Sequence, residues 1–239
     1  FNLNASTITN NGAAIGAGLY NLGTSTTTNG TIGGNAATNA AGGIITAGSL
    51  SVNGTTISGN SATNFGGGLY EFSGATNLTG AAFTGNSSAT GGAIYAHSTA
   101  AALNVGTSSF TNNTATTQGG GITAVSPVVT TVTNSSFTGN AGGVQGGAIS
   151  ASGPVTISGS TIDGNNATTG GAIVTTGTTS ITGGSISGNT ALNAGAYYSL
   201  GTTTIDGTTI SNNTADGGTT SNGGNGGAIY NVANLTIKN

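Results

Sequence analysis

One short motif recurs nine times along the 239 residues of the chain: a small residue, Ile or Phe, two further residues, and Asn. The apolar positions are 24 to 27 residues apart, at Ile8, Ile32, Ile57, Phe83, Phe110, Phe137, Ile162, Ile186 and Ile210. The Asn follows three residues later, at Asn11, Asn35, Asn60, Asn86, Asn113, Asn140, Asn165, Asn189 and Asn213. Such a period predicts a solenoid, in which each repeat is one coil that stacks on its neighbours. We therefore expect a single β-helix domain over residues 1–239.

Two further motifs complete each repeat. Gly-Gly-Ala-Ile or a near variant ends at Leu19, Ile45, Leu69, Ile94, Ile122, Ile149, Ile173, Tyr197 and Ile229. A short alternating segment such as Leu50-Ser-Val52 then ends five residues before the next Ile or Phe. In the second repeat, Thr27 takes that apolar place. Three period-two segments per repeat predict an all-β solenoid with three strands per coil, about 24–27 residues per coil and nine to ten coils.

The nine Asn residues are expected to share one corner of the coils. Asn tolerates the left-handed backbone region and can bond to its own backbone, so it suits a tight turn. Because coils stack at the inter-strand spacing of about 4.8 Å, equivalent side chains lie above one another. We predict a structural ladder of amides along this corner.

Charge restricts the function further. Only Glu71, Asp163, Asp206, Asp216 and Lys238 carry a fixed charge, and the chain has no Arg and no Cys. With one Lys there is almost nothing to neutralise phosphates, so we expect no nucleic-acid partner. No apolar run approaches the length of a transmembrane segment, and thiolate metal sites are excluded. We expect no metal and no cofactor.

The acidic residues do not form a predicted catalytic pair. Glycoside hydrolysis needs two carboxylates that face one bond. Asp163 follows Ile162, whereas Asp206 follows Ile205 on a different strand, and Glu71 and Asp216 fall in arcs of variable length. We interpret all four as solvated surface acids, and His97 as an exposed side chain without a partner. The chain is therefore predicted not to be an enzyme.

Two rows of side chains are expected on the outside. Ser and Thr occupy most places beside the inward Ile or Phe, which suits either an ice-binding face or an ordinary uncharged strand face. A possible aromatic stripe comprises Tyr20, Tyr70, Tyr95, Tyr198 and Tyr230, each of which directly follows a second-motif residue. Tyr in such a row can bind glycans or a partner chain, or stack on its neighbours. The sequence leaves these alternatives open.

The repeats carry a family resemblance. Phe-Thr-Gly-Asn at 83–86 and 137–140, Phe-Thr-Asn-Asn at 110–113 and Gly-Gly-Ala-Ile at 91–94, 146–149, 170–173 and 226–229 resemble the paired repeats of the polymorphic outer-membrane proteins. Similar repeats fill many large secreted bacterial β-helix proteins. The resemblance implies a right-handed parallel β-helix that is exported and displayed at the cell surface for adhesion or surface structure. The charged loops usual in that family are missing.

The ends of the chain suggest a mode of assembly. Phe1 and Leu3 begin on the same type of strand on which Leu235 and Ile237 end, and neither end shows a polar cap. The chain starts at Phe1 without a Met, so we expect removal of a leader or excision from a longer solenoid. Our favoured interpretation is an extracellular structural subunit or fibre segment that associates head to tail. The alternatives are a surface adhesin that binds a glycan or host protein and, less favoured, an ice-binding solenoid.

Overall fold

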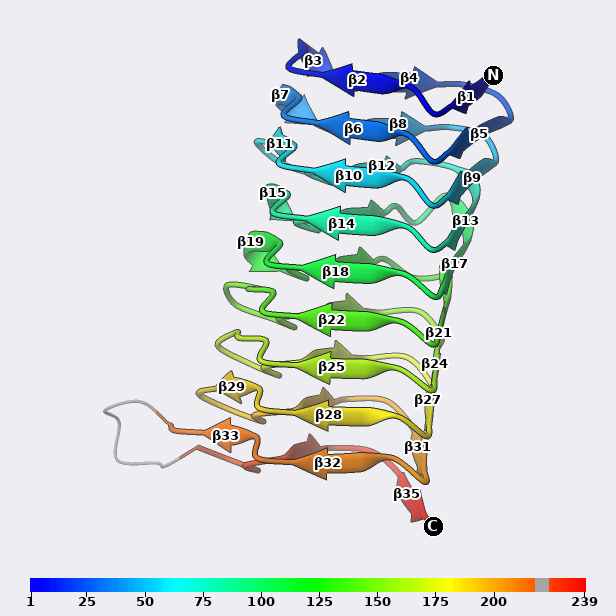
Figure 1. Cartoon of the computed structure of the whole chain (residues 1–239). Coiled ribbons are helices and arrows are strands. Elements are labelled where there is room, and N and C mark those ends of the chain that lie inside the picture. Colours follow the sequence, from blue (N-terminus) through cyan, green and yellow to red (C-terminus); the bar gives the residue numbers. More distant parts are fainter. Residues whose placement is uncertain (218–223) are drawn as a thin grey trace.

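The computed structural model describes residues 1–217 and 224–239, and it is a right-handed parallel β-helix of about nine coils (Figure 1). Every strand pair in the described part is parallel, and the described residues contain no helix that could span a membrane. The two termini lie at opposite ends of the rod (Figure 1). The predicted fold class is confirmed.

Each coil contributes one strand to each of three long sheets. Sheet A holds β1 (Asn2–Asn4), β5 (Ser25–Thr28), β9 (Leu50–Asn53), β13 (Gly74–Thr79), β17 (Ala100–Gly106), β21 (Val129–Thr133), β24 (Val155–Ser158), β27 (Thr179–Thr182), β31 (Thr203–Asp206) and β35 (Leu235–Lys238). Sheet B holds β2 (Thr7–Thr9), β6 (Thr31–Gly33), β10 (Thr56–Ser58), β14 (Ala82–Thr84), β18 (Ser109–Thr111), β22 (Ser136–Thr138), β25 (Thr161–Asp163), β28 (Ser185–Ser187) and β32 (Thr209–Ser211). Sheet D holds β4 (Leu19–Asn21), β8 (Ile44–Thr46), β12 (Leu69–Glu71), β16 (Ile94–Ala96), β20 (Ile122–Ala124), β23 (Ile149–Ala151), β26 (Ile173–Thr175), β30 (Tyr197–Ser199) and β34 (Ile229–Asn231).

In addition to the three predicted strands, many coils have a fourth, short strand, and these strands form a further parallel sheet. This sheet C lies in the arc between sheets B and D, and comprises β3 (Gly12–Ile15), β7 (Ala36–Ala40), β11 (Ser61–Ala62), β15 (Ser87–Thr90) and β19 (Thr114–Gln118). Further along the rod, β29 (Thr190–Ala191) pairs with β33 (Thr214–Ala215). These segments alternate too weakly in hydrophobicity to be recognised as strands from the sequence.

Equivalent residues stack on one another in the core. Ile57 pairs in register with Ile32 on one side and Phe83 on the other. The rings of Phe83, Phe110 and Phe137 are nearly parallel, with centroids 5.0 and 4.5 Å apart. All five side chains are fully buried. On the side of sheet B, the core is therefore a narrow column of similar apolar residues, which keeps successive coils in register.

The register corrects one assignment in the second motif. Ile44, and not Ile45, pairs with Leu19 and Leu69. The reason is that Ala41 takes the left-handed position, with φ 59°, that Gly occupies in most coils. The motif of this coil therefore begins one residue earlier than the glycines suggest, and Ile45 lies on the outer side of sheet D.

Candidate functional site

The nine Asn side chains form the predicted ladder, which runs along the corner where sheet B ends. Asn113 donates from its backbone N and from Nδ2 to Oδ1 of Asn140, at 3.0 and 2.9 Å. Its Oδ1 accepts the same two bonds from Asn86, at 3.0 and 2.9 Å. The pattern is the same at every step from Asn11 to Asn213, and the seven interior side chains are fully buried.

Each interior amide connects three coils. Besides the bond to the next Asn, Nδ2 of Asn113 donates to the carbonyl oxygen of Phe83 in the preceding coil, at 3.0 Å. The ladder Asn does not itself take the left-handed conformation that we expected. The residue before it does, for example Gly85 with φ 62° and Asn112 with φ 53°. That turn points the following Asn inward, where its amide forms the hydrogen bonds with buried backbone groups that water would otherwise form.

Glu71 is the clearest departure from the sequence-based interpretation. It was predicted to be a surface acid, but its side chain is fully buried. Glu71 is the third residue of β12, so it points into the core as Leu69 does, while Tyr70 points outward. The period-two alternation was the available signal, and it was missed because the strand was taken to end at Leu69.

The surroundings of Glu71 are mostly apolar. In register it lies between Thr46 and Ala96, and neither of its carboxyl oxygens has a hydrogen-bond partner of normal geometry. Burial raises the pKa of Glu71 to about 8, against a smaller lowering by the nearby hydroxyl and amide of Thr76. The Thr76 hydroxyl is itself buried without a regular partner. Glu71 is therefore mostly protonated at neutral pH.

The remaining acids do not converge on one place. Asp163 is half-buried on sheet B and accepts a hydrogen bond from the Ser187 hydroxyl at 2.8 Å. Asp206 lies on sheet A, opposite Lys238 of the next strand. Among residues 1–217 and 224–239 there is no group of three His, Cys, Asp or Glu side chains that could hold a metal ion. Asp163 and Asp206 thus lie on different sheets, and Asp216 follows β33 at an exposed position.

The five tyrosines of the possible stripe lie on strands of sheet D, in two groups. Tyr198 and Tyr230 stack on each other, with centroids 4.9 Å apart. Tyr20, Tyr70 and Tyr95 lie several coils away. In the coils between these groups the same position is occupied by Thr123, Ser150 and Val174.

Tyr70 and Tyr95 belong to a larger aromatic cluster. Their ring centroids are 5.3 Å apart, and the Phe65 ring lies 4.7 Å from Tyr95. His97 was expected to have no partner, yet its ring stacks on Phe72 at 5.2 Å and its Nδ1 lies 2.9 Å from the Thr99 hydroxyl. Burial raises the pKa of both Tyr70 and Tyr95, and the proximity of Tyr95 adds to the rise at Tyr70.

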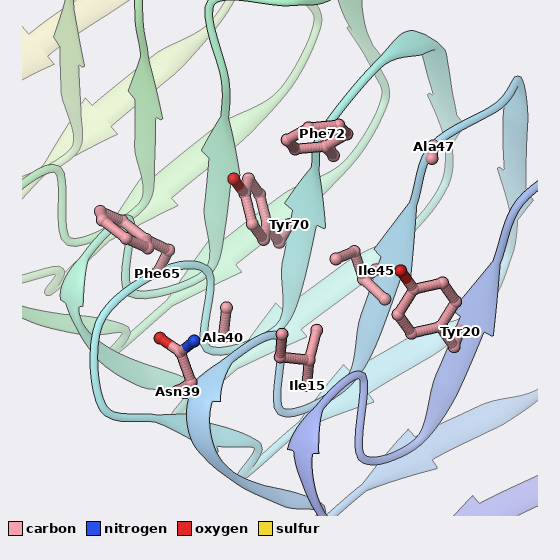
Figure 2. Close-up of a pocket in the computed structure, with 9 residues that line it drawn as sticks. All are labelled: Ile15, Tyr20, Asn39, Ala40, Ile45, Ala47, Phe65, Tyr70 and Phe72. Atoms are coloured by element: carbon pink, nitrogen blue, oxygen red, sulfur yellow. The ribbon is translucent and has the colours of Figure 1, made fainter.

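A hollow of about 280 Å³ opens beside this cluster. Figure 2 shows Tyr20 and Tyr70 on either side of Ile45, with Phe72 and Phe65 farther along and Asn39 at the edge. Ile45 is only 6% exposed and forms the floor, whereas Tyr20 is 56% exposed. No charged side chain lines the hollow. Four of its nine lining residues are aromatic: Tyr20, Phe65, Tyr70 and Phe72.

The ends carry exposed apolar side chains on or directly beside strands of sheet A. Phe1 is 62% exposed, and Leu3 packs partly against the core. At the other end, Leu235 and Ile237 are exposed on β35. The end-to-end interface proposed from sequence stays a prediction, as does the ice-binding alternative for the Ser and Thr rows of sheet B.

Three segments of the chain match a known repeat. Residues 80–97, 107–125 and 207–232 match the Chlamydia polymorphic membrane protein repeat. Each segment contains an Ile or Phe motif and the glycine-rich motif that follows it, so the predicted resemblance is confirmed. No curated protein and no solved structure matches the chain. The repeat similarity indicates a β-helix of the passenger type at the cell surface or outer membrane.

Proposed function

We propose that this chain is a non-enzymatic structural segment of a surface fibre, which associates end to end. The observation that carries the proposal is the uniform stacking of the coils. Strands β1 and β35 are the two edge strands of sheet A, so β1 of one copy can pair with β35 of another and continue that sheet.

The chemistry of the end layers supports this association. An exposed parallel strand has unpaired N–H and C=O groups, and it pairs with another chain unless charge, Pro or a cover prevents it. Within β1 and β35 themselves, Lys238 is the only charged side chain. Such a contact joins two different surfaces, so its repetition in one direction gives an open filament. The separation of Asp163 and Asp206 on different sheets supports a role without catalysis.

The test compares two exposed apolar side chains near the same end. Ile237, on β35, is 63% exposed, and Val232, outside the strands, is 61% exposed. Ile237→Glu should abolish filaments in negative-stain electron microscopy and lower the sedimentation coefficient, because it places a charge in the stacked layer. Val232→Glu should leave both unchanged. Unmodified chain that stays monomeric at high concentration would contradict end-to-end association, and polysaccharide cleavage lost in Asp163→Asn would contradict the absence of catalysis.

A further inference from the structure

The spacing of the tyrosines on sheet D creates a gap of molecular size. Tyr20, Ile45 and Tyr70 are register partners on adjacent strands, so the two tyrosines are two strand spacings apart, about 9.6 Å. A flat ligand in contact with two aromatic groups needs about 7–8 Å, twice the van der Waals distance of 3.5–4.0 Å. Tyrosines on adjacent coils, in contrast, leave no such space, as the stacked Tyr198 and Tyr230 show. The smaller Ile45 is what leaves the gap open.

We propose that this hollow is a binding site for one ring of an uncharged carbohydrate, held between Tyr20 and Tyr70 above Ile45. The apolar C–H faces of a sugar ring suit aromatic walls, and its hydroxyl groups need polar partners at the rim. Both tyrosine hydroxyls can supply them. The hollow, about 280 Å³, is near the lower limit of small-ligand sites, which matches one sugar unit rather than a long buried segment.

The rim also favours a sugar over an apolar peptide side chain. Asn64 donates to Oδ1 of Asn39 at 2.8 Å, which fixes the orientation of the Asn39 amide. Its nitrogen is then on the side of the hollow (Figure 2). A sugar hydroxyl can accept a hydrogen bond from this donor, which an apolar side chain cannot do.

Charge decides between classes of glycan. Neither Lys238 nor the N-terminus lines the hollow, and the wall contains no other cation that could pair with a carboxylate or sulfate. Burying an unpaired charge is unfavourable. The site is therefore expected to take neutral sugar rings and to reject sialylated, uronic or sulfated ones.

The experiment uses an array of neutral oligosaccharides built from glucose, galactose, mannose and N-acetylglucosamine, together with sialylated and sulfated counterparts. The unmodified chain should bind at least one neutral class and not its acidic counterpart. Tyr20→Ala and Ile45→Tyr should each weaken that binding at least tenfold, the first by removing a wall and the second by filling the gap. Tyr230→Ala, a tyrosine of the same sheet without a gap, should bind as the unmodified chain does.

Thermal melting of each variant verifies that the β-helix is intact, and Tyr20 is exposed enough for its removal to leave the core unchanged. Three results would overturn the proposal: no binding to any neutral oligosaccharide, binding confined to acidic glycans, or full binding by folded Ile45→Tyr. Loss of filaments in Ile237→Glu without loss of glycan binding would separate this site from end-to-end association.

Discussion

Two rows of inward side chains run along the β-helix, one of Asn throughout and one mixed, and they differ in how completely the hydrogen bonds of their polar groups are formed. At the corner after sheet B, each interior Asn has the same partners in every coil. At the corner between sheets D and A, the inward positions are Asn21, Thr46, Glu71, Ala96, Ala124, Ala151, Thr175, Ser199 and Asn231. In a uniform row, each side chain finds the same hydrogen-bond partner one coil away. In a mixed row, the available partners depend on which residues the neighbouring coils provide.

The mixed row contains both extremes. Near the C-terminal end, the Tyr197 hydroxyl lies 2.6 Å from the Thr175 hydroxyl and 2.9 Å from that of Thr203, within a buried network. In the middle of the rod the row is Ala and needs no partners. Glu71, in contrast, is buried beside groups that do not complete its bonds. This difference shows that a polar side chain buried in this solenoid keeps its hydrogen bonds only where the adjacent coils supply donors and acceptors that match it.

The largest expected effect is a loss of stability on raising the pH from 5 to 9. The pKa of Glu71 is about 8 in the folded protein, against 4.5 in the unfolded chain. Below pH 4.5 both states hold the proton; above it the unfolded chain loses the proton first, so the free energy of unfolding falls until the pH passes 8. The full difference is on the order of 5 kcal/mol. Urea unfolding at pH 5 and pH 9 measures the larger part of it.

The matched variant is Glu71→Gln, which keeps the shape and removes the titration. It should unfold with nearly the same midpoint at pH 5 and pH 9, and at pH 9 it should be more stable than the unmodified chain. Equal pH dependence in both proteins would mean that Glu71 is not the group responsible.

The next largest effect is expected at the regular row. Asn113→Leu removes the acceptor of two Asn86 bonds and the donor to the Phe83 carbonyl, and leaves these groups buried. We expect a loss of about 3 kcal/mol in the free energy of unfolding. The control is Asn104→Ala, which removes a bond of the same type to Asn77 on the exposed face of sheet A. That change should be close to neutral, and equal losses at both sites would contradict a special role for the ladder.

A smaller effect is expected beside the mixed row, where Tyr197 contacts its member Thr175. Tyr197→Phe removes one hydroxyl from between Thr175 and Thr203. The expected loss is about 1–2 kcal/mol, because the two threonines keep other partners in the network. Tyr198→Phe, on the outer side of the same strand, is the control. Chemical denaturation that ranks Tyr198→Phe as the more harmful change would refute the network's contribution.

The smallest effect should be a gain. The Thr130 hydroxyl is buried without a hydrogen-bond partner, so Thr130→Val exchanges an unsatisfied polar atom for a methyl group of similar size. We expect an increase of up to about 1 kcal/mol in the free energy of unfolding. Thr131→Val, at the half-exposed neighbouring position, should change little. A clear destabilisation by Thr130→Val would indicate a partner that the geometry does not reveal.

Repetition explains which features were predictable from the sequence. The Asn ladder and the stacked Ile and Phe column recur in every coil, so one motif at a constant spacing was enough to predict both. Glu71, the orientation of Ile45 and the hollow beside Tyr20 each occur once. They depend on how one coil differs from its neighbours, and a single departure has no periodic signal. The Leu69-Tyr70-Glu71 alternation was the only local indication that the acid points inward.

Because each ladder amide bonds only to the coils directly above and below it, the number of coils is not set by the corner itself. Deleting the 27 residues from 87 to 113 would bring Asn86 against Asn140 in the same phase that Asn113 now occupies. The rod would shorten by one step of about 4.8 Å while its cross-section stayed the same. The length of the rod can therefore change in steps of one whole coil while the packing of its interior stays the same.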